Sequence, residues 1–220
     1  GTQWQLVEEV ANAVFPVYKT LKQMASHADV FYADDSPIRI LSLMAENERE
    51  PEPERKGMRT TALIAALGEH SIFLYESGRK HAGDNLGDLL DGRPKDLGPP
   101  IQMTDALASN TSHSFKVIVT HCILHARRLF FEIKAFFPEI CGRVLDDIAK
   151  VYHFEDLAKK QGLNQDQRLA FHQQHSGAVM KELKSWLEEQ WDQKQIEPNS
   201  SLGKATRYLL GHWETLTGFL

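Results

Sequence analysis

The chain has 220 residues, of which 42% are hydrophobic and 25% are charged, and its formal net charge is −5 at pH 7. This length and composition fit one soluble globular domain, or one domain that carries a large insertion. No apolar run reaches the roughly 18 residues that a membrane-spanning helix needs, and the negative charge argues against binding nucleic acid by bulk electrostatics. An acidic, metal-binding pocket that acts on nucleic acid is still compatible with that charge.

The cysteines and the first residue indicate the origin of the chain. Cys122 and Cys141 are far apart and show no disulfide framework, which favours a reducing cytoplasm. No signal peptide opens the sequence. The chain starts with Gly1 inside a helical pattern, and we therefore expect it to be an excerpt of a longer protein.

The first part of the chain predicts a helix and then an acidic strand. Apolar side chains recur at helical spacing over residues 3–27, and Pro16 is expected to kink or split this helix. Residues 29–41 are β-branched and aromatic, which predicts a strand, and they contain two adjacent carboxylates, Asp34 and Asp35. An ionised carboxylate there needs a cation such as Mg²⁺, or hydrogen-bond donors. The alternative is an aspartate that caps or turns the end of the strand.

A three-stranded meander is predicted next. Residues 58–68 and 70–77 are strand candidates, and the short connection at Gly68 indicates an antiparallel hairpin. Residues 46–56 are charged and contain prolines, which predicts a solvated loop or hairpin tip. Residues 78–93 have the apolar spacing of a short helix.

The order of the following elements indicates a fold. A short apolar run at 100–110 contains an acid, Asp105, and a strand over 115–122 leads into a helix at 126–136. Three antiparallel strands, a helix, a strand ending in an acid, and a further strand with its helix form the element order of a ribonuclease-H-like fold. That fold places acids of its first and fourth strands side by side, as two-metal phosphoryl transfer requires.

The last third of the chain contains only helical patterns. They cover residues 139–160, 165–193 and 201–219, and Asn164 with Gln167 has the spacing of a capping box. The sequence therefore predicts an all-α part attached to an α/β part.

Several segments together resemble the catalytic region of insertion sequence 66 family transposases, and they cover nearly the whole chain in the expected order. These segments are ADDSPIRIL, GRKHAGDNLGDLL, PIQMTDALASN, THCILHARRLFFEI, FHQQHSGAVMKELKSWLEEQ and EPNSSLGKATRYLLGHWETLTGFL. The resemblance implies an α/β (α+β) ribonuclease-H-like core with a large all-α insertion. The expected domains are a helical lead-in at 1–27, the catalytic core at 28–138 and the helical insertion at 139–220.

The resemblance also implies which residues carry the chemistry. In this family an Asp-Asp-Glu triad holds Mg²⁺ or Mn²⁺, and Asp34 and Asp105 match its two aspartates as catalytic metal ligands. Asp35 occupies the neighbouring acidic position. Because successive side chains of a strand point to opposite faces, Asp34 and Asp35 cannot both enter one site without a bulge, and we choose Asp34. His125 and Arg128 are auxiliary candidates that could contact a phosphate at the edge of the site.

The third acid is the departure from the family pattern. The family glutamate follows the region that resembles HWETLTGFL, whereas this sequence ends at Leu220. Glu214 lies within that region and is not assigned to the triad. We therefore expect residues 1–220 alone to bind metal weakly and to cleave DNA poorly.

The implied function is metal-dependent cleavage at transposon ends and strand transfer by in-line phosphoryl transfer. The expected partners are transposon-end DNA, target DNA and further copies of the protein in a homo-oligomeric complex, in the bacterial cytoplasm and at the nucleoid when DNA is bound. No membrane partner is expected. One alternative is a metal-dependent nuclease with no part in transposition. Another is a non-catalytic remnant that binds DNA or a partner through its helices.

A histidine and cysteine cluster offers a further metal hypothesis. His121, Cys122 and His125 have the pattern H-C-x-x-H. A zinc site needs four protein ligands, or three and a water, and no companion pair stands at ligand spacing nearby. Packing and surface roles are therefore favoured for these residues.

Overall fold

A computed structural model describes residues 1–49 and 56–220, and the chain divides into two compact units, Gly1–Val119 and Thr120–Leu220. Each unit is described by itself. No helix of the described residues is both long enough and apolar enough to cross a membrane.

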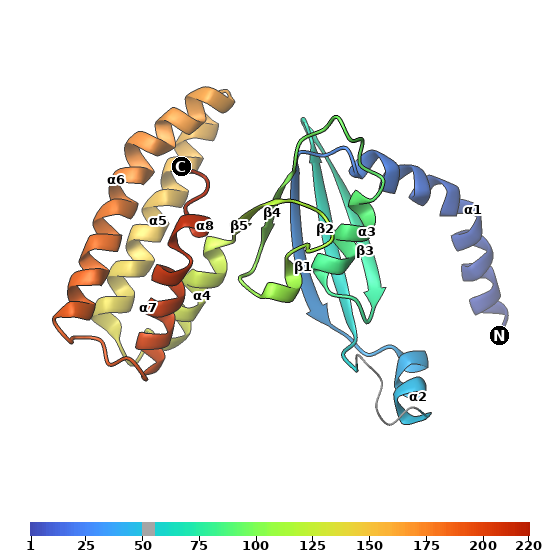
Figure 1. The fold of residues 1–220 in the computed structure, drawn as a ribbon, viewed down its shortest axis with the longest axis horizontal. Helices are drawn as coiled ribbons and strands as arrows, with labels where there is room; N and C mark the ends of the chain where they lie inside the picture. Colours follow the sequence, from blue (N-terminus) through green and yellow to red (C-terminus); the bar gives the residue numbers. More distant parts are fainter. Residues whose placement is uncertain (50–55) are drawn as a thin grey trace. The chain divides into compact units, whose positions relative to one another are not determined.

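The first unit consists of one sheet and of helices that precede, interrupt or follow its strands in the sequence (Figure 1). Its elements, in chain order, are α1 (Thr2–Ala25), β1 (Val30–Pro37), α2 (Leu41–Arg49), β2 (Arg59–Leu67), β3 (His70–Gly78), α3 (Ala82–Leu90), β4 (Ile101–Thr104), the short 3₁₀ helix η1 (Ala108–Asn110) and β5 (Ile118–His121), which ends in the second unit.

The five strands form one mixed sheet in the order β3-β2-β1-β4-β5. β1 pairs with β2, and β2 with β3, in antiparallel register, which confirms the predicted meander. Gly68 has a φ of 58°, the left-handed conformation that glycine adopts most readily in a tight hairpin turn. β1 and β4 are parallel neighbours. The sheet is therefore mixed, and the two strands that carry or precede the predicted acids lie side by side.

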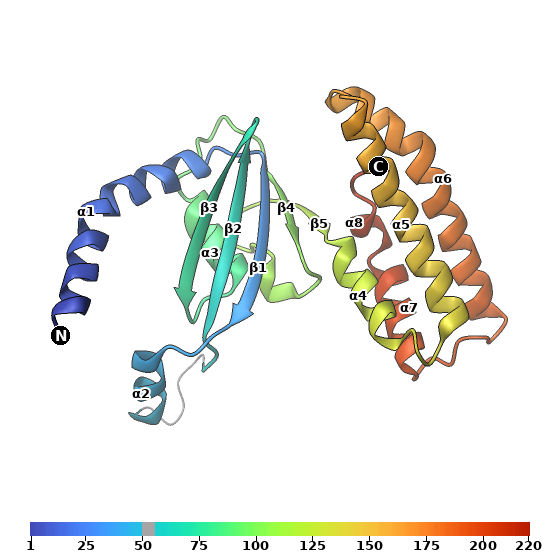
Figure 2. The same cartoon turned by 180° about the vertical axis from the view of Figure 1, so that it is seen from behind.

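One face of this sheet is covered by α3, which lies in front of the strands in Figure 1 and behind them in Figure 2. Alternate residues of β1, Phe31 and Ala33, are buried on the covered face, whereas Tyr32 and Asp34 are exposed on the other. Helix α3 contributes Leu86 and further apolar residues to this core. The alternation follows from the two-residue period of a strand.

One helix, α1, precedes the meander in sequence, and another, α2, lies between its strands β1 and β2. α1 is one helix with Pro16 inside it, so the chain is not split there, and its last turns pack on the core through Tyr18 and Leu21. α2 was not predicted. The loop prediction for 46–56 is wrong up to Arg49, where α2 ends, and residues 50–55 lie outside the described part.

Hydrogen bonds from one arginine hold α2. The Arg79 guanidinium donates from Nη1 to Asn47 Oδ1 at 2.6 Å and from Nη2 to the Leu43 carbonyl at 3.4 Å. Arg79 is more than 30 residues from its partners in α2. Helix α2 itself has no buried residue. Tertiary hydrogen bonds therefore hold a segment whose own apolar pattern is weak.

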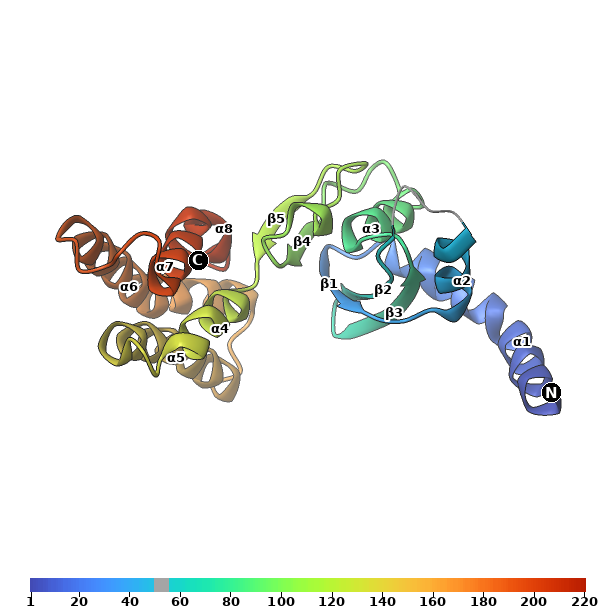
Figure 3. The same cartoon turned by 90° about the horizontal axis from the view of Figure 1, so that it is seen from below.

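The second unit is helical, as predicted, and its helices gather around one core (Figure 3). They are α4 (Ile123–Ile133), α5 (Pro138–Lys160), α6 (Gln165–Asp192), α7 (Ser201–Gly211) and α8 (Trp213–Leu216). The capping box is confirmed, because Asn164 Oδ1 accepts from the Gln167 amide at 3.0 Å and Gln167 Oε1 accepts from the Asn164 amide at 3.1 Å. Helix α4, which the sequence groups with the α/β core, packs against α5 and α7 in this unit.

Candidate functional site

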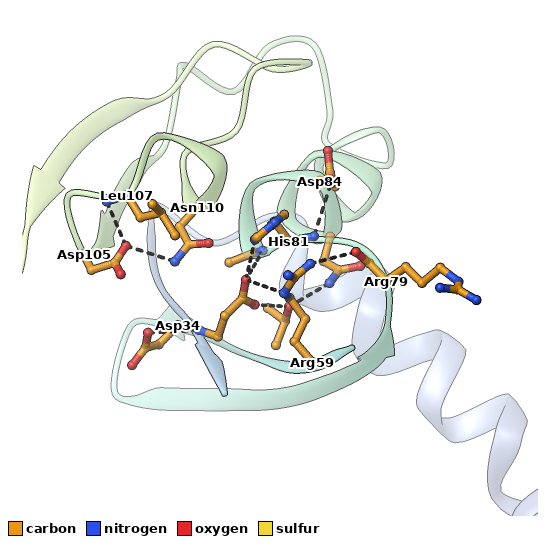
Figure 4. Close-up of polar contacts among 12 residues, drawn as sticks. Asp34, Arg59, Arg79, His81, Asp84, Asp105, Leu107 and Asn110 are labelled. Carbon is orange, nitrogen blue, oxygen red and sulfur yellow. Dashed lines mark hydrogen bonds and ion pairs between the residues drawn. The ribbon is translucent and has the colours of Figure 1, made fainter. Parts of the chain in front are cut away.

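Asp34 lies near the carboxyl end of β1, on the sheet face that α3 does not cover. It pairs across the sheet with Ala62 of β2, and its side chain is exposed. The Asp35 amide donates to Asp34 Oδ1 at 2.9 Å. Figure 4 shows the Asp34 carboxylate directed away from the contacts that surround its neighbour. The strand therefore presents this carboxylate to solvent, where a cation can reach it.

Asp105 follows directly after β4. Its Oδ1 accepts hydrogen bonds from the Leu107 amide at 3.1 Å and from Asn110 Nδ2 at 2.9 Å, as Figure 4 shows. Both bonds use the same oxygen, and the side chain is half-buried. The carboxylate is thus held in one orientation by the loop that follows it.

A buried glutamine anchors that loop. Gln102 Nε2 donates to the Asn110 carbonyl at 2.6 Å, and Gln102 Oε1 accepts from the Ser112 amide at 3.0 Å. Gln102 is fully buried and Asn110 is 1% exposed. Because buried amides keep their hydrogen bonds, this link fixes the loop and, through Asn110, the Asp105 carboxylate.

The two predicted acids occupy equivalent places on neighbouring strands. The last paired residues of the parallel strands are Tyr32 of β1 and Met103 of β4. Asp34 and Asp105 each follow that pair by two residues. Since β1 and β4 run in the same direction, both acids lie at the same end of the sheet.

Asp35 lies on the opposite face from Asp34, which confirms the predicted alternation; the pairing of β1 with β2 continues through both residues without a bulge. The Asp35 side chain is only 11% exposed. It accepts from Thr61 Oγ1 at 2.6 Å and from the Ala82 amide at 3.1 Å, and His81 Nδ1 lies 3.2 Å away. These donors tie β1 to β2 and to the first turn of α3.

Arg59 completes the surroundings of Asp35. Its Nε lies 3.7 Å from Asp35 Oδ2, and its Nη1 donates to the Arg79 carbonyl at 2.8 Å (Figure 4). An ion pair and hydrogen-bond donors are what a mostly buried carboxylate needs. No local spacing links Thr61, Arg59 and His81 to Asp35, so these contacts could not be predicted from the sequence.

The whole chain matches one protein family. The sequence model of the family described as Transposase IS66 family matches residues 1–220. The chain belongs to this transposase family. This confirms the resemblance that the sequence motifs indicated.

This IS66-family chain also matches a protein from Sinorhizobium fredii, described as "Uncharacterized protein y4jD". The two are 32% identical over 111 residues, which cover 50% of this chain and 21% of the relative. The aligned part therefore spans about a fifth of the relative's length.

Two auxiliary candidates of the IS66-family chain lie in the second unit. His125 is in the first turn of α4, and Arg128 is an exposed residue of the same helix. A contact of either residue with a phosphate stays a prediction.

No group of three histidine, cysteine or acidic side chains that could hold a metal occurs within residues 1–49 and 56–220. His121 of the H-C-x-x-H pattern contacts Thr215 Oγ1 through Nδ1 at 2.8 Å, and its ring meets His212 edge-on at 5.0 Å. Cys122 and Cys141 are free thiols, and burial raises the pKa of Cys141.

Proposed function

We propose that this chain is the catalytic region of a DNA transposase that cleaves DNA at transposon ends and transfers the strands to target DNA. The family match over all 220 residues carries this proposal. The fold supports it, because the sheet order β3-β2-β1-β4-β5 sets the first and fourth strands side by side, as in a ribonuclease-H-like core. The proposed partners are transposon-end DNA, target DNA and a second copy of the protein.

Asp34 and Asp105 are the proposed ligands of Mg²⁺ or Mn²⁺. Mg²⁺ is often bound by one or two carboxylates, with waters and substrate phosphate oxygens completing its shell. The two aspartates fit that role, since Asp34 is exposed and the hydrogen bonds from Leu107 and Asn110 to Asp105 both use Oδ1. A bound divalent ion supplies charge neutralisation at the phosphodiester and lowers the pKa of an attacking hydroxyl or water.

The chain's own residues would position these ligands. The Asn110 side-chain amide and the Leu107 backbone N–H both donate to Asp105 Oδ1. These two bonds would fix the plane of the carboxylate and therefore the direction of Oδ2. Asp35 keeps the end of β1 in place through α3 and β2, and it is therefore a positioning residue for its neighbour Asp34. Such fixed placement favours phosphoryl transfer, in which alignment supplies much of the rate.

Metal binding tests the proposed ligands directly. We would titrate residues 1–220 with Mn²⁺ and follow free Mn²⁺ by electron paramagnetic resonance. Asp34→Asn and Asp105→Asn are each expected to weaken binding by at least about tenfold, because each removes a ligand. Asp96→Asn, an exposed acid in the loop after α3, is the control and should bind as the wild type does. Equal binding by all the variants would refute the site.

Transposition tests the activity. In the full-length protein, Asp34→Asn and Asp105→Asn should abolish both cleavage of donor DNA and strand joining. Cleavage without joining in the wild type would instead indicate a nuclease. Unchanged transposition by both variants would indicate a non-catalytic binding protein.

A further inference from the structure

Helix α4 has one buried apolar face and one exposed face that carries large apolar side chains and cations. Ala126 and Phe130 are fully buried in the core of the second unit. On the other side of the helix, Leu124 is 51% exposed and Phe131 is 60% exposed, and Phe136 just beyond the helix is 79% exposed. Large apolar side chains gathered on a surface commonly mark a place of interaction.

Three cations are interleaved with these aromatic residues. Arg127, Arg128 and Lys134 lie between or beside the two phenylalanines, with Glu132 as the one acid over 123–136. Within the described chain, none of the three cations forms an ion pair with an acid. The segment therefore has a formal charge of +2 in a chain whose net charge is −5. Its charge is complementary to that of a polyanion.

Within the described residues, four of the ten other cations of the second unit form ion pairs with acids. Ion pairs with acids bring together Arg143 and Glu182, Lys150 and Asp147, and Glu155 with both Lys159 and Arg168. Their charge is thus largely neutralised within the unit. The α4 segment differs in that three cations without an ion pair in the described chain lie close together, between residues 127 and 134.

One cation and one ring of this surface already stack. The Arg127 guanidinium carbon lies 5.7 Å from the centre of the Phe131 ring, which is a cation–π contact. Proteins that bind single strands combine backbone-tracking cations with aromatic rings on which bases stack. Phe131 and Phe136 offer such rings, and the cations beside them would meet phosphates.

We propose that the exposed face of α4 and the turn after it, formed by Arg127, Arg128, Phe131, Lys134 and Phe136, binds a single DNA strand with unstacked bases. It rests on the proposed function in that DNA is the partner. The surface would hold the strand by its phosphates and by base stacking, independently of the acids Asp34 and Asp105.

The test is binding of a fluorescein-labelled oligothymidylate of about 20 nucleotides to residues 1–220, followed by fluorescence anisotropy in EDTA. Phe131→Leu keeps an apolar side chain but removes the ring, and it should weaken binding by about 5- to 100-fold with an unchanged salt dependence. Arg127→Gln combined with Arg128→Gln should lower the slope of log K against log salt by about 1.4. Arg128→Gln alone should lower the slope of log K against log salt by half as much. Circular dichroism checks that each variant is folded.

The matched control is Lys159→Gln combined with Lys160→Gln, a basic pair at the end of α5 in the same unit. This control should change the slope by much less than the α4 pair does. If the control lowered the slope of log K against log salt as much as the α4 pair does, bulk charge would account for DNA binding, and this result would overturn the proposal. So would tighter binding of the wild type to phosphatidylserine vesicles than to DNA, or self-association that Phe131→Leu abolishes.

Metal-free binding separates this inference from the proposed function. Phe131→Leu and the double arginine variant should bind Mn²⁺ as the wild type does, because both variants keep Asp34 and Asp105. Weaker DNA binding with unchanged Mn²⁺ binding in these variants supports the α4 surface independently of the proposed metal ligands. Normal Mn²⁺ binding with no effect of the α4 variants would refute the α4 surface alone.

Discussion

Gly83 in the first turn of α3 lies against the loop that holds Asp105. A Cβ atom added at Gly83 would lie 2.2 Å from the Thr111 carbonyl oxygen and 2.8 Å from that of Ser109. Both contacts are to backbone atoms, which cannot rotate away. The Gly83→Ala substitution should therefore push α3 and this loop apart.

The size of the effect follows from two opposing terms. Carbon contacts settle near 3.5 Å, so the loop must move by about 1 Å, and overpacking of this kind costs about 1–3 kcal/mol. Alanine favours the helix over glycine by at most about 1 kcal/mol. Because the clash is with backbone, we expect a net loss of about 1–2 kcal/mol in the local stability of the loop.

Hydrogen exchange measures this loss where it occurs. The amides of Asn110, Thr111 and Ser112 are hydrogen-bonded within the loop or to Gln102, and in Gly83→Ala they should exchange about 5- to 30-fold faster. Asp105 should also hold Mn²⁺ more weakly in this variant.

The control lies one turn further along α3. A Cβ at Gly87 would meet the Ser114 hydroxyl at 2.1 Å. Ser114 is exposed, and its side chain can rotate, so Gly87→Ala should leave exchange in the loop unchanged. Equal exchange in both variants, or protection in Gly83→Ala as in the wild type, would refute the reasoning.

Two further predictions concern carboxylates that are mostly, but not fully, buried. Asp35→Ala should destabilise the first unit by about 2–3 kcal/mol, measured by exchange of the β1 and β2 amides. The substitution leaves Thr61 and the Ala82 amide without their acceptor and Arg59 without its ion-pair partner. Asp34→Ala should have little effect on stability. Burial raises the pKa of Glu155, but hydrogen bonds from His172, Lys159 and Arg168 outweigh it and lower the pKa overall. The stability that ionised Glu155 contributes is therefore complete above its unfolded pKa and is lost as the pH falls through its folded pKa. In Glu155→Gln the free energy of unfolding should depend less on pH in the acid range. Unfolding followed by tryptophan fluorescence measures this dependence.

Much of the fold was predictable because its signals are local. The β2–β3 hairpin follows from a glycine that adopts positive φ at the turn, and the start of α6 follows from the reciprocal capping of Asn164 and Gln167. Helix α2 was missed for the complementary reason. Its charged sequence has no buried face, and Arg79, some thirty residues away, provides its hydrogen bonds.

For the candidate site, the sequence by itself predicted the acids as metal ligands, and it determined the strand that carries Asp34 and the alternation that directs Asp35 to the opposite face. These are consequences of backbone geometry over a few residues. The element order predicted that β1 and β4 are neighbours, and the sheet pairs them. Only the tertiary structure decided which face α3 covers and that Thr61, Arg59 and His81 surround Asp35. Those facts depend on packing between segments distant in sequence, and no local pattern encodes which distant segment becomes the neighbour.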